Sequence, residues 1–190
     1  DEVKQGSVIG YLDPQSIRYG LHLMIAKKDS MLNFEEHLKF TEFLPFYSVK
    51  AAAGAFSESQ ESNPDGWIPV KKKKYTQTSF VIQVKGHSMY PRISDGDLCI
   101  FDHYFEGSKN GKIVLVQHRD IADPENGGKY TVKLYNSKKI QSEEELIGNY
   151  QIELKPLNHN YKSIILNQTS ELEVQFIGVF VDKIQLVSNL

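Results

Sequence analysis

The chain has 190 residues, 40% of them hydrophobic, and a formal net charge of -2. This length and composition allow one substantial core with a small appendage. The nearly balanced charge gives no general attraction to phosphate, so we expect no direct nucleic-acid binding by this chain.

Targeting features are missing from the sequence. No apolar run approaches the roughly 20 residues that a membrane-spanning helix needs, and the first residues do not have a signal-peptide layout. The single cysteine, Cys99, excludes an internal disulfide and lies in an apolar run. We therefore predict a cytoplasmic protein without membrane contact. The first residue is Asp1 and not methionine, which is typical of a fragment or a processed chain.

Residues 1–45 are predicted to form an N-terminal arm or the remnant of an upstream domain. Loose alternation predicts a strand over 19–26, and apolar residues near a helical period predict a helix over 33–44 that Pro45 ends. No basic recognition helix is found here, so no helix-turn-helix is expected.

The next stretch, 46–56, places three alanines and a glycine after an apolar run. Such small side chains can enter a narrow peptidase cleft in extended form, and a glycine after the cut bond lets the substrate bend. A close-packed strand or a tight turn is the alternative. The polar residues 57–65 predict a flexible loop, which suits a segment that must enter and leave a site.

Residues 67–70 predict a strand or sheet edge. The four lysines at 71–74 are interpreted as a solvated turn without a function.

A serine follows the next predicted strand, at 79–84. Ser88 lies in a turn between Gly86 and Pro91, and a second turn, D-G-D at 95–97, leads to a strand at 98–101. A serine placed in this way is presented to a reactant, although serine in a turn is also common for purely structural reasons.

Further strands are predicted at 112–117 and 130–135, with a long polar loop between them. Alternation places Val132 and Leu134 on one face and Lys133 on the other. Lys133 is either an exposed edge charge or a buried amine. Strands flanking a Pro/Asn turn are predicted within 151–166, and a closing strand over 172–181. Many short strands with turns between them predict a mainly β protein with a partly closed, twisted sheet.

The pattern G-x-S-M-x-P at 86–91, followed by D-G-D, resembles the active-site signature of self-cleaving serine peptidases of the LexA/UmuD type, family S24. The similarity spans about residues 46–187. It implies a LexA-like β-sheet domain at 46–190, with a cleavage segment at 46–66 and a short α/β N-terminal arm.

The resemblance also implies roles for particular residues. Ser88 corresponds to the nucleophile, and Lys133, in a V-K-x-L strand, corresponds to the general base. Ala53-Gly54, 35 positions before the serine, corresponds to the cleaved bond. Lys133 follows Ser88 by 45 positions, which is more than in compact members, and the polar loop before it would absorb the extra length. The backbone N–H of Met89 is expected to contact the oxyanion.

The expected chemistry follows from these two side chains. A serine hydroxyl needs a base, and a lysine can act as one when burial lowers its pKa. Unlike histidine, it needs no orienting aspartate. We expect self-cleavage into fragments of 53 and 137 residues, at a rate that rises with pH. His87 is not expected to pair with Ser88, because adjacent residues point apart.

No cofactor or metal is expected, because the histidines have no metal-ligand spacing and no nucleotide-binding or other hydrolase motif is present. The resemblance implies a homodimer and, for SOS-response members, the RecA filament as co-protease. The alternative function is a non-cleaving dimerisation or interaction module of the same fold within a larger DNA-metabolism or defence protein. A peptidase that acts on another chain is the third hypothesis.

Overall fold

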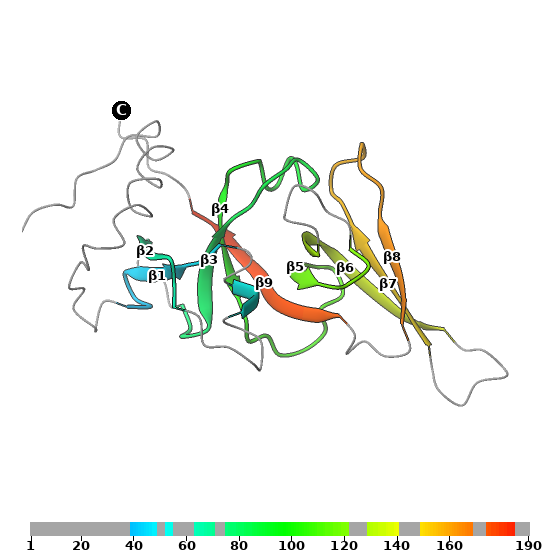
Figure 1. Cartoon of the computed structure of the whole chain (residues 1–190), viewed down its shortest axis with the longest axis horizontal. Helices are drawn as coiled ribbons and strands as arrows, with labels where there is room; N and C mark the ends of the chain where they lie inside the picture. Colours follow the sequence, from blue (N-terminus) through cyan, green and yellow to red (C-terminus); the bar gives the residue numbers. More distant parts are fainter. Residues whose placement is uncertain are drawn as a thin grey trace, which may run out of the picture. The chain divides into compact units, whose positions relative to one another are not determined.

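The computed structural model describes residues 39–48, 52–54, 63–70, 75–121, 129–140, 149–168 and 174–184. All of them belong to one compact unit, Glu35–Ile184. Within these ranges, nine strands form one mixed sheet with the order β2-β1-β3-β4-β9-β5-β6-β7-β8 (Figure 1). The prediction of a mainly β protein is confirmed. The strand and the first half of the helix predicted for the N-terminal arm lie outside the described residues.

From β2 onward the strands lie where the sequence predicted strands, whereas β1 was not predicted. The strands are β1 (Phe43–Phe46), β2 (Gly66–Pro69), β3 (Ser79–Gln83), β4 (Leu98–Asp102), β5 (Lys112–Gln117), β6 (Tyr130–Ile140), β7 (Asn149–Lys155), β8 (Ile164–Gln168) and β9 (Gln175–Lys183). β6 extends five residues beyond the predicted end of its strand at 135. β2 lies at one edge of the sheet, as predicted for residues 67–70.

The helix predicted over 33–44 is wrong at its C-terminal end. Residues 40–42 form a turn, and β1 begins at Phe43. Leu44 is fully buried opposite Ile68 of β2, so tertiary pairing overrides the local helical period. Pro45 is accommodated inside β1, because β1 pairs with β3 only at Phe46 and needs no N–H at the proline.

The last strand, β9, lies in the middle of the sheet and does not close an edge. It pairs antiparallel with β4 on one side and with β5 on the other (Figure 1). β3 and β4 flank the serine stretch, and β6 carries the lysine. β9 therefore joins the serine half of the sheet to the lysine half.

Both faces of the central sheet are buried. Alternate residues of β5 enter different hydrophobic clusters: Ile113 and Leu115 belong to one, and Val114 and Val116 to the other. A sheet covered on both faces shows nearly continuous apolar strands, as β5 does. Lys133 lies directly opposite Val114, so its side chain points into one of these covered faces.

Among the described residues, no helix has the length and apolarity to cross a membrane.

Candidate active site

A tight loop between β3 and β4 presents Ser88. Gly86 adopts a positive φ of 88°, which glycine tolerates without strain, and its N–H donates to Asp95 Oδ1 over 2.8 Å. Gly96 also has a positive φ, and its N–H donates to the Val84 carbonyl. Asp95 and Gly96 of the D-G-D turn thus bind the start of the serine loop, so the two ends of the loop are held together. The Tyr90-Pro91 peptide bond in this loop is cis.

Asp97, the second aspartate of that turn, fixes its far side. Asp97 Oδ2 accepts the Ser94 N–H over 2.7 Å and lies 2.9 Å from Lys183 Nζ at the end of β9. The serine loop is therefore tied to the central strand by an ion pair. Sequence reasoning identified D-G-D as a turn but did not identify these carboxylates as supports of the serine.

Lys133 approaches Ser88 from β6. The pairing of β5 with β6 keeps register from Lys112 opposite Tyr135 to Gln117 opposite Tyr130, so the longer spacing between serine and lysine does not displace the strand. Lys133 Nζ lies 2.9 Å from Ser88 Oγ. The two residues are 5% and 7% exposed, respectively. Most of the polar loop, 122–128, lies outside the described residues.

The amine of Lys133 also makes hydrogen bonds to two further oxygens. Lys133 Nζ donates to Thr131 Oγ1 over 2.7 Å and to the Val132 carbonyl over 3.1 Å. A neutral amine has two N–H donors and one lone pair. It can donate to these two oxygens while the lone pair accepts the Ser88 hydroxyl proton. The site therefore accommodates the form of lysine that acts as a base. Thr131 was not singled out from the sequence, although strand alternation places it on the same face as Lys133.

The turn after β7 holds the serine backbone from the other side. The N–H groups of Leu157 and Asn158 both donate to the Ser88 carbonyl over 3.0 Å. Asn158 Nδ2 donates to the His87 carbonyl, also over 3.0 Å. The sequence predicted a turn here, but nothing in it indicated contact with the serine loop.

The backbone N–H groups of Ser88 and Met89 have a different environment. Within the described part of the chain, neither N–H has a hydrogen-bond acceptor. The Met89 side chain is buried in the larger hydrophobic cluster, which anchors this end of the loop. Two adjacent, unused donors beside a serine Oγ are suited to hold a developing oxyanion.

The predicted cleavage segment packs near this site. Ala52 and Ala53 are buried in the hydrophobic cluster that contains Met89, the residue after Ser88. Residues 52–54 are helical, however, and the Ala52 N–H donates to the Ser48 carbonyl over 2.8 Å. The extended form expected from the sequence is therefore not the form observed. A helical turn lets both alanines bury their methyl groups while the backbone makes its own hydrogen bond.

The two ends of this segment are clamped together. Ser48 N–H donates to Asp65 Oδ2 over 2.7 Å, and Asp65 N–H donates to the Phe46 carbonyl over 2.8 Å. Burial, and secondarily the Asp65 carboxylate, raises the pKa of Tyr47 beside this clamp. The residues at the two ends of the cleavage segment, 48 and 65, are therefore held together. Residues 55–62, most of the predicted flexible loop, lie outside the described residues, as do the four lysines.

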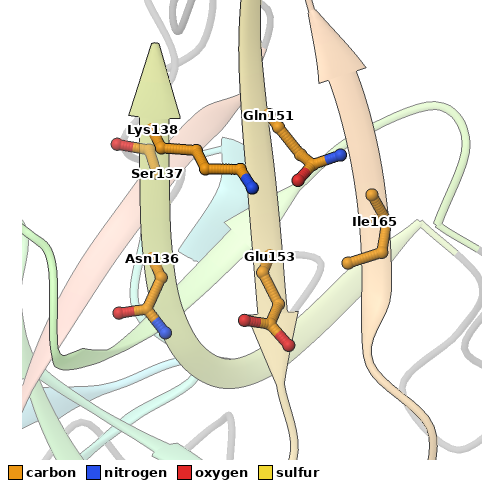
Figure 2. A pocket seen from close by; sticks show the side chains of 6 residues that line it. All are labelled: Asn136, Ser137, Lys138, Gln151, Glu153 and Ile165. Carbon is orange, nitrogen blue, oxygen red and sulfur yellow. The ribbon is translucent and has the colours of Figure 1, made fainter. Parts of the chain in front are cut away.

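The other candidate sites lack a pair of side chains suited to catalysis. His87 is exposed. Clusters of three or more metal-ligating side chains are absent from the described ranges. A shallow pocket of about 320 Å³ on β6, β7 and β8 is lined by Asn136, Ser137, Lys138, Gln151, Glu153 and Ile165 (Figure 2). This lining includes neither Ser88 nor Lys133, so the pocket is separate from the serine–lysine pair.

A buried serine–lysine pair on a β-sheet is the arrangement expected of a peptidase that uses lysine as its base. The chain belongs to the Peptidase S24-like family, whose model matches residues 45–181, well over half of the sequence. The match confirms the resemblance stated from the G-x-S-M-x-P and D-G-D motifs. A search of the curated proteins finds no match.

Proposed function

We propose that this protein is a serine endopeptidase that cuts its own Ala53-Gly54 bond with Ser88 as nucleophile and Lys133 as general base. The observation that carries the proposal is the 2.9 Å separation of Lys133 Nζ and Ser88 Oγ, both buried. Burial disfavours the ammonium form of an amine, because the charge loses its hydration. A desolvated lysine beside a serine is therefore suited to take the hydroxyl proton.

The reaction begins when residues 52–54 leave their helical turn and the Ala53 carbonyl enters the site in extended form. Ser88 Oγ forms a bond to the carbonyl carbon, its proton passes to Lys133 Nζ, and the carbonyl oxygen becomes an oxyanion held by the N–H groups of Ser88 and Met89. The lysine then gives the proton to the Gly54 nitrogen as the peptide bond breaks. Water, deprotonated by the same amine, releases Ala53 from Ser88.

The burial of Ala52 and Ala53 with Met89 in one hydrophobic cluster supports cleavage within one chain, because the residue after Ser88 and the cleavage segment already share that cluster. The clamp between Ser48 and Asp65 limits how far the segment can move. A segment held in this way has a high effective concentration at the site.

Incubation of the purified chain at mildly alkaline pH tests the proposal. We expect fragments of 53 and 137 residues by mass spectrometry, the first ending at Ala53 and the second beginning at Gly54. Ser88→Ala and Lys133→Ala should stay whole. A rate independent of protein concentration indicates cleavage in cis, and a rate that rises with concentration indicates cleavage in trans. A wild-type chain that stays intact at every pH, with and without RecA filament, would favour the non-cleaving module instead.

The setting is also part of the proposal. We place the protein in the cytoplasm as a homodimer, with an SOS-response type of role in which a RecA filament stimulates cleavage. The resemblance to LexA and UmuD supports this setting. Addition of RecA filament at neutral pH should accelerate cleavage of the wild type but not of Ser88→Ala, and sedimentation should give the mass of a dimer.

A further inference from the structure

The turn at 156–161 contacts the serine loop through three hydrogen bonds, all directed at carbonyl groups. Leu157 N–H and Asn158 N–H reach the Ser88 carbonyl, and Asn158 Nδ2 reaches the His87 carbonyl. Two consecutive peptide groups are therefore held by the same turn. Such a concentration of bonds on one short stretch restricts its rotation more than packing alone would.

The orientation of these peptide groups follows from their planarity. In a trans peptide unit the C=O and the next residue's N–H point in opposite directions. The His87 carbonyl belongs to the unit that carries the Ser88 N–H, and the Ser88 carbonyl to the unit that carries the Met89 N–H. Because both carbonyls point toward the 157–158 turn, both N–H groups point away from it. In the described part of the chain, neither of these two N–H groups has a hydrogen-bond acceptor.

We propose that Asn158 is a positioning residue, which orients the Ser88 and Met89 peptide groups so that their N–H groups form the oxyanion site. This inference rests on the proposed function, since it concerns the same serine. Asn158 suits the role because its side chain and its backbone bind successive carbonyls. Its own Oδ1 accepts the Asn160 N–H over 3.0 Å, and its carbonyl accepts the Tyr161 N–H over 3.1 Å, so the turn that holds the serine is itself fixed.

Two substitutions separate this role from general support of the fold. Asn158→Asp keeps the size of the side chain and an acceptor for Asn160, but loses the donor to the His87 carbonyl. Asn158→Ala loses both side-chain bonds. His159→Ala is the matched control, because His159 is an exposed neighbour on the same turn.

The first measurement does not require self-cleavage. Diisopropyl fluorophosphate reacts with an activated serine: Ser88 Oγ forms a bond to phosphorus, fluoride leaves, and the hydroxyl proton passes to Lys133. The phosphoryl oxygen needs the same N–H donors as a tetrahedral intermediate. Intact-mass spectrometry of wild type and variants, with Ser88→Ala as the blank, gives the labelling rate.

The second measurement is the rate of cleavage as a function of pH, together with the melting temperature. For both Asn158 variants we expect labelling and cleavage to slow by roughly 10-fold or more, as loss of an oxyanion donor does. The pH midpoint should stay unchanged, since Lys133 is untouched, and the melting temperature should stay within a few degrees of wild type. His159→Ala should match wild type in every measurement.

Several results would overturn the inference. If either folded Asn158 variant labels and cuts at the wild-type rate, the side chain does not position the donors. If the pH midpoint shifts with the rate, the effect passes through Lys133 and not through the oxyanion site. A wild type that is labelled at Ser88 but never cut at Ala53-Gly54 would refute self-cleavage alone. A wild type that is neither labelled nor cut would refute both proposals.

Discussion

Thr131 Oγ1 lies 2.7 Å from Lys133 Nζ, and neither side chain is more than 5% exposed. The two residues are on the same face of β6, because side chains two positions apart on a strand point the same way. The threonine hydroxyl therefore holds the end of a long, flexible side chain 2.9 Å from Ser88 Oγ, a distance that suits the proposed proton transfer.

Replacement of this hydroxyl by a methyl group should slow self-cleavage. In Thr131→Val the amine loses one of its acceptors and samples positions away from Ser88, so we expect a decrease of about 10-fold in rate. Thr131→Ser keeps the hydroxyl and should cut nearly as fast as wild type. Densitometry of the two fragments over time measures both rates. Equal rates for Thr131→Val and wild type would mean that Lys133 is held by other contacts.

Self-cleavage by the wild type should become faster as the pH rises. Below the pKa of the lysine the amine is protonated and cannot accept the serine proton, so the rate should fall about tenfold for each pH unit. Above that pKa the rate should reach a plateau. Fragment yields between pH 6 and pH 11 give this profile. A rate that instead decreases with rising pH would exclude an amine as the base.

Gly178 on β9 leaves no space for a larger residue. A Cβ at this position would lie 2.9 Å from Phe80 Cζ and 3.0 Å from Phe101 Cβ. Both rings are fully buried in the same cluster, so Gly178→Ala should destabilise the domain by about 1 to 3 kcal/mol. Urea unfolding followed by tryptophan fluorescence measures the change. At Gly66 no atom lies within 4 Å of a built Cβ, so Gly66→Ala serves as the control and should change stability little.

The thiol of Cys99 should be inert in the folded protein. Burial, followed by the charge of Asp97, raises the pKa of Cys99 to about 12. At pH 8 the thiol is therefore protonated and also shielded from solvent, whereas reaction requires an accessible thiolate. Iodoacetamide should leave the native chain unmodified for hours and alkylate it rapidly in denaturant. Fast alkylation of the native chain would show that β4 opens readily.

Much of the sheet could be predicted because its strands carry local signals. The apolar runs before and after the serine, and the V-K-x-L run around Lys133, are each short and bounded by turn residues, and all of them became strands. Strand alternation alone could not decide whether Lys133 was exposed or buried. The burial of Lys133 depends on which segments pack against each face of the sheet, and these segments are distant in the sequence.

Non-local pairing explains the remaining differences. The helical period before Pro45 was outweighed by the burial of Leu44 against β2. The contact of Asn158 with His87 joins residues 71 positions apart, and no periodicity within either segment encodes it. The helical form of residues 52–54 likewise depends on the cluster that receives Ala52 and Ala53.

The position of β9 in the middle of the sheet determines when the sheet can be completed during synthesis. The residues of β9 leave the ribosome last among the nine described strands, and in the sheet both β4 and β5 pair with them. A nascent chain that stops before Gln175 lacks the strand that brings the two halves of the sheet together. Under the proposed function, the chain is therefore expected to stay uncut until translation has passed this strand, which would protect unfinished chains from premature cleavage.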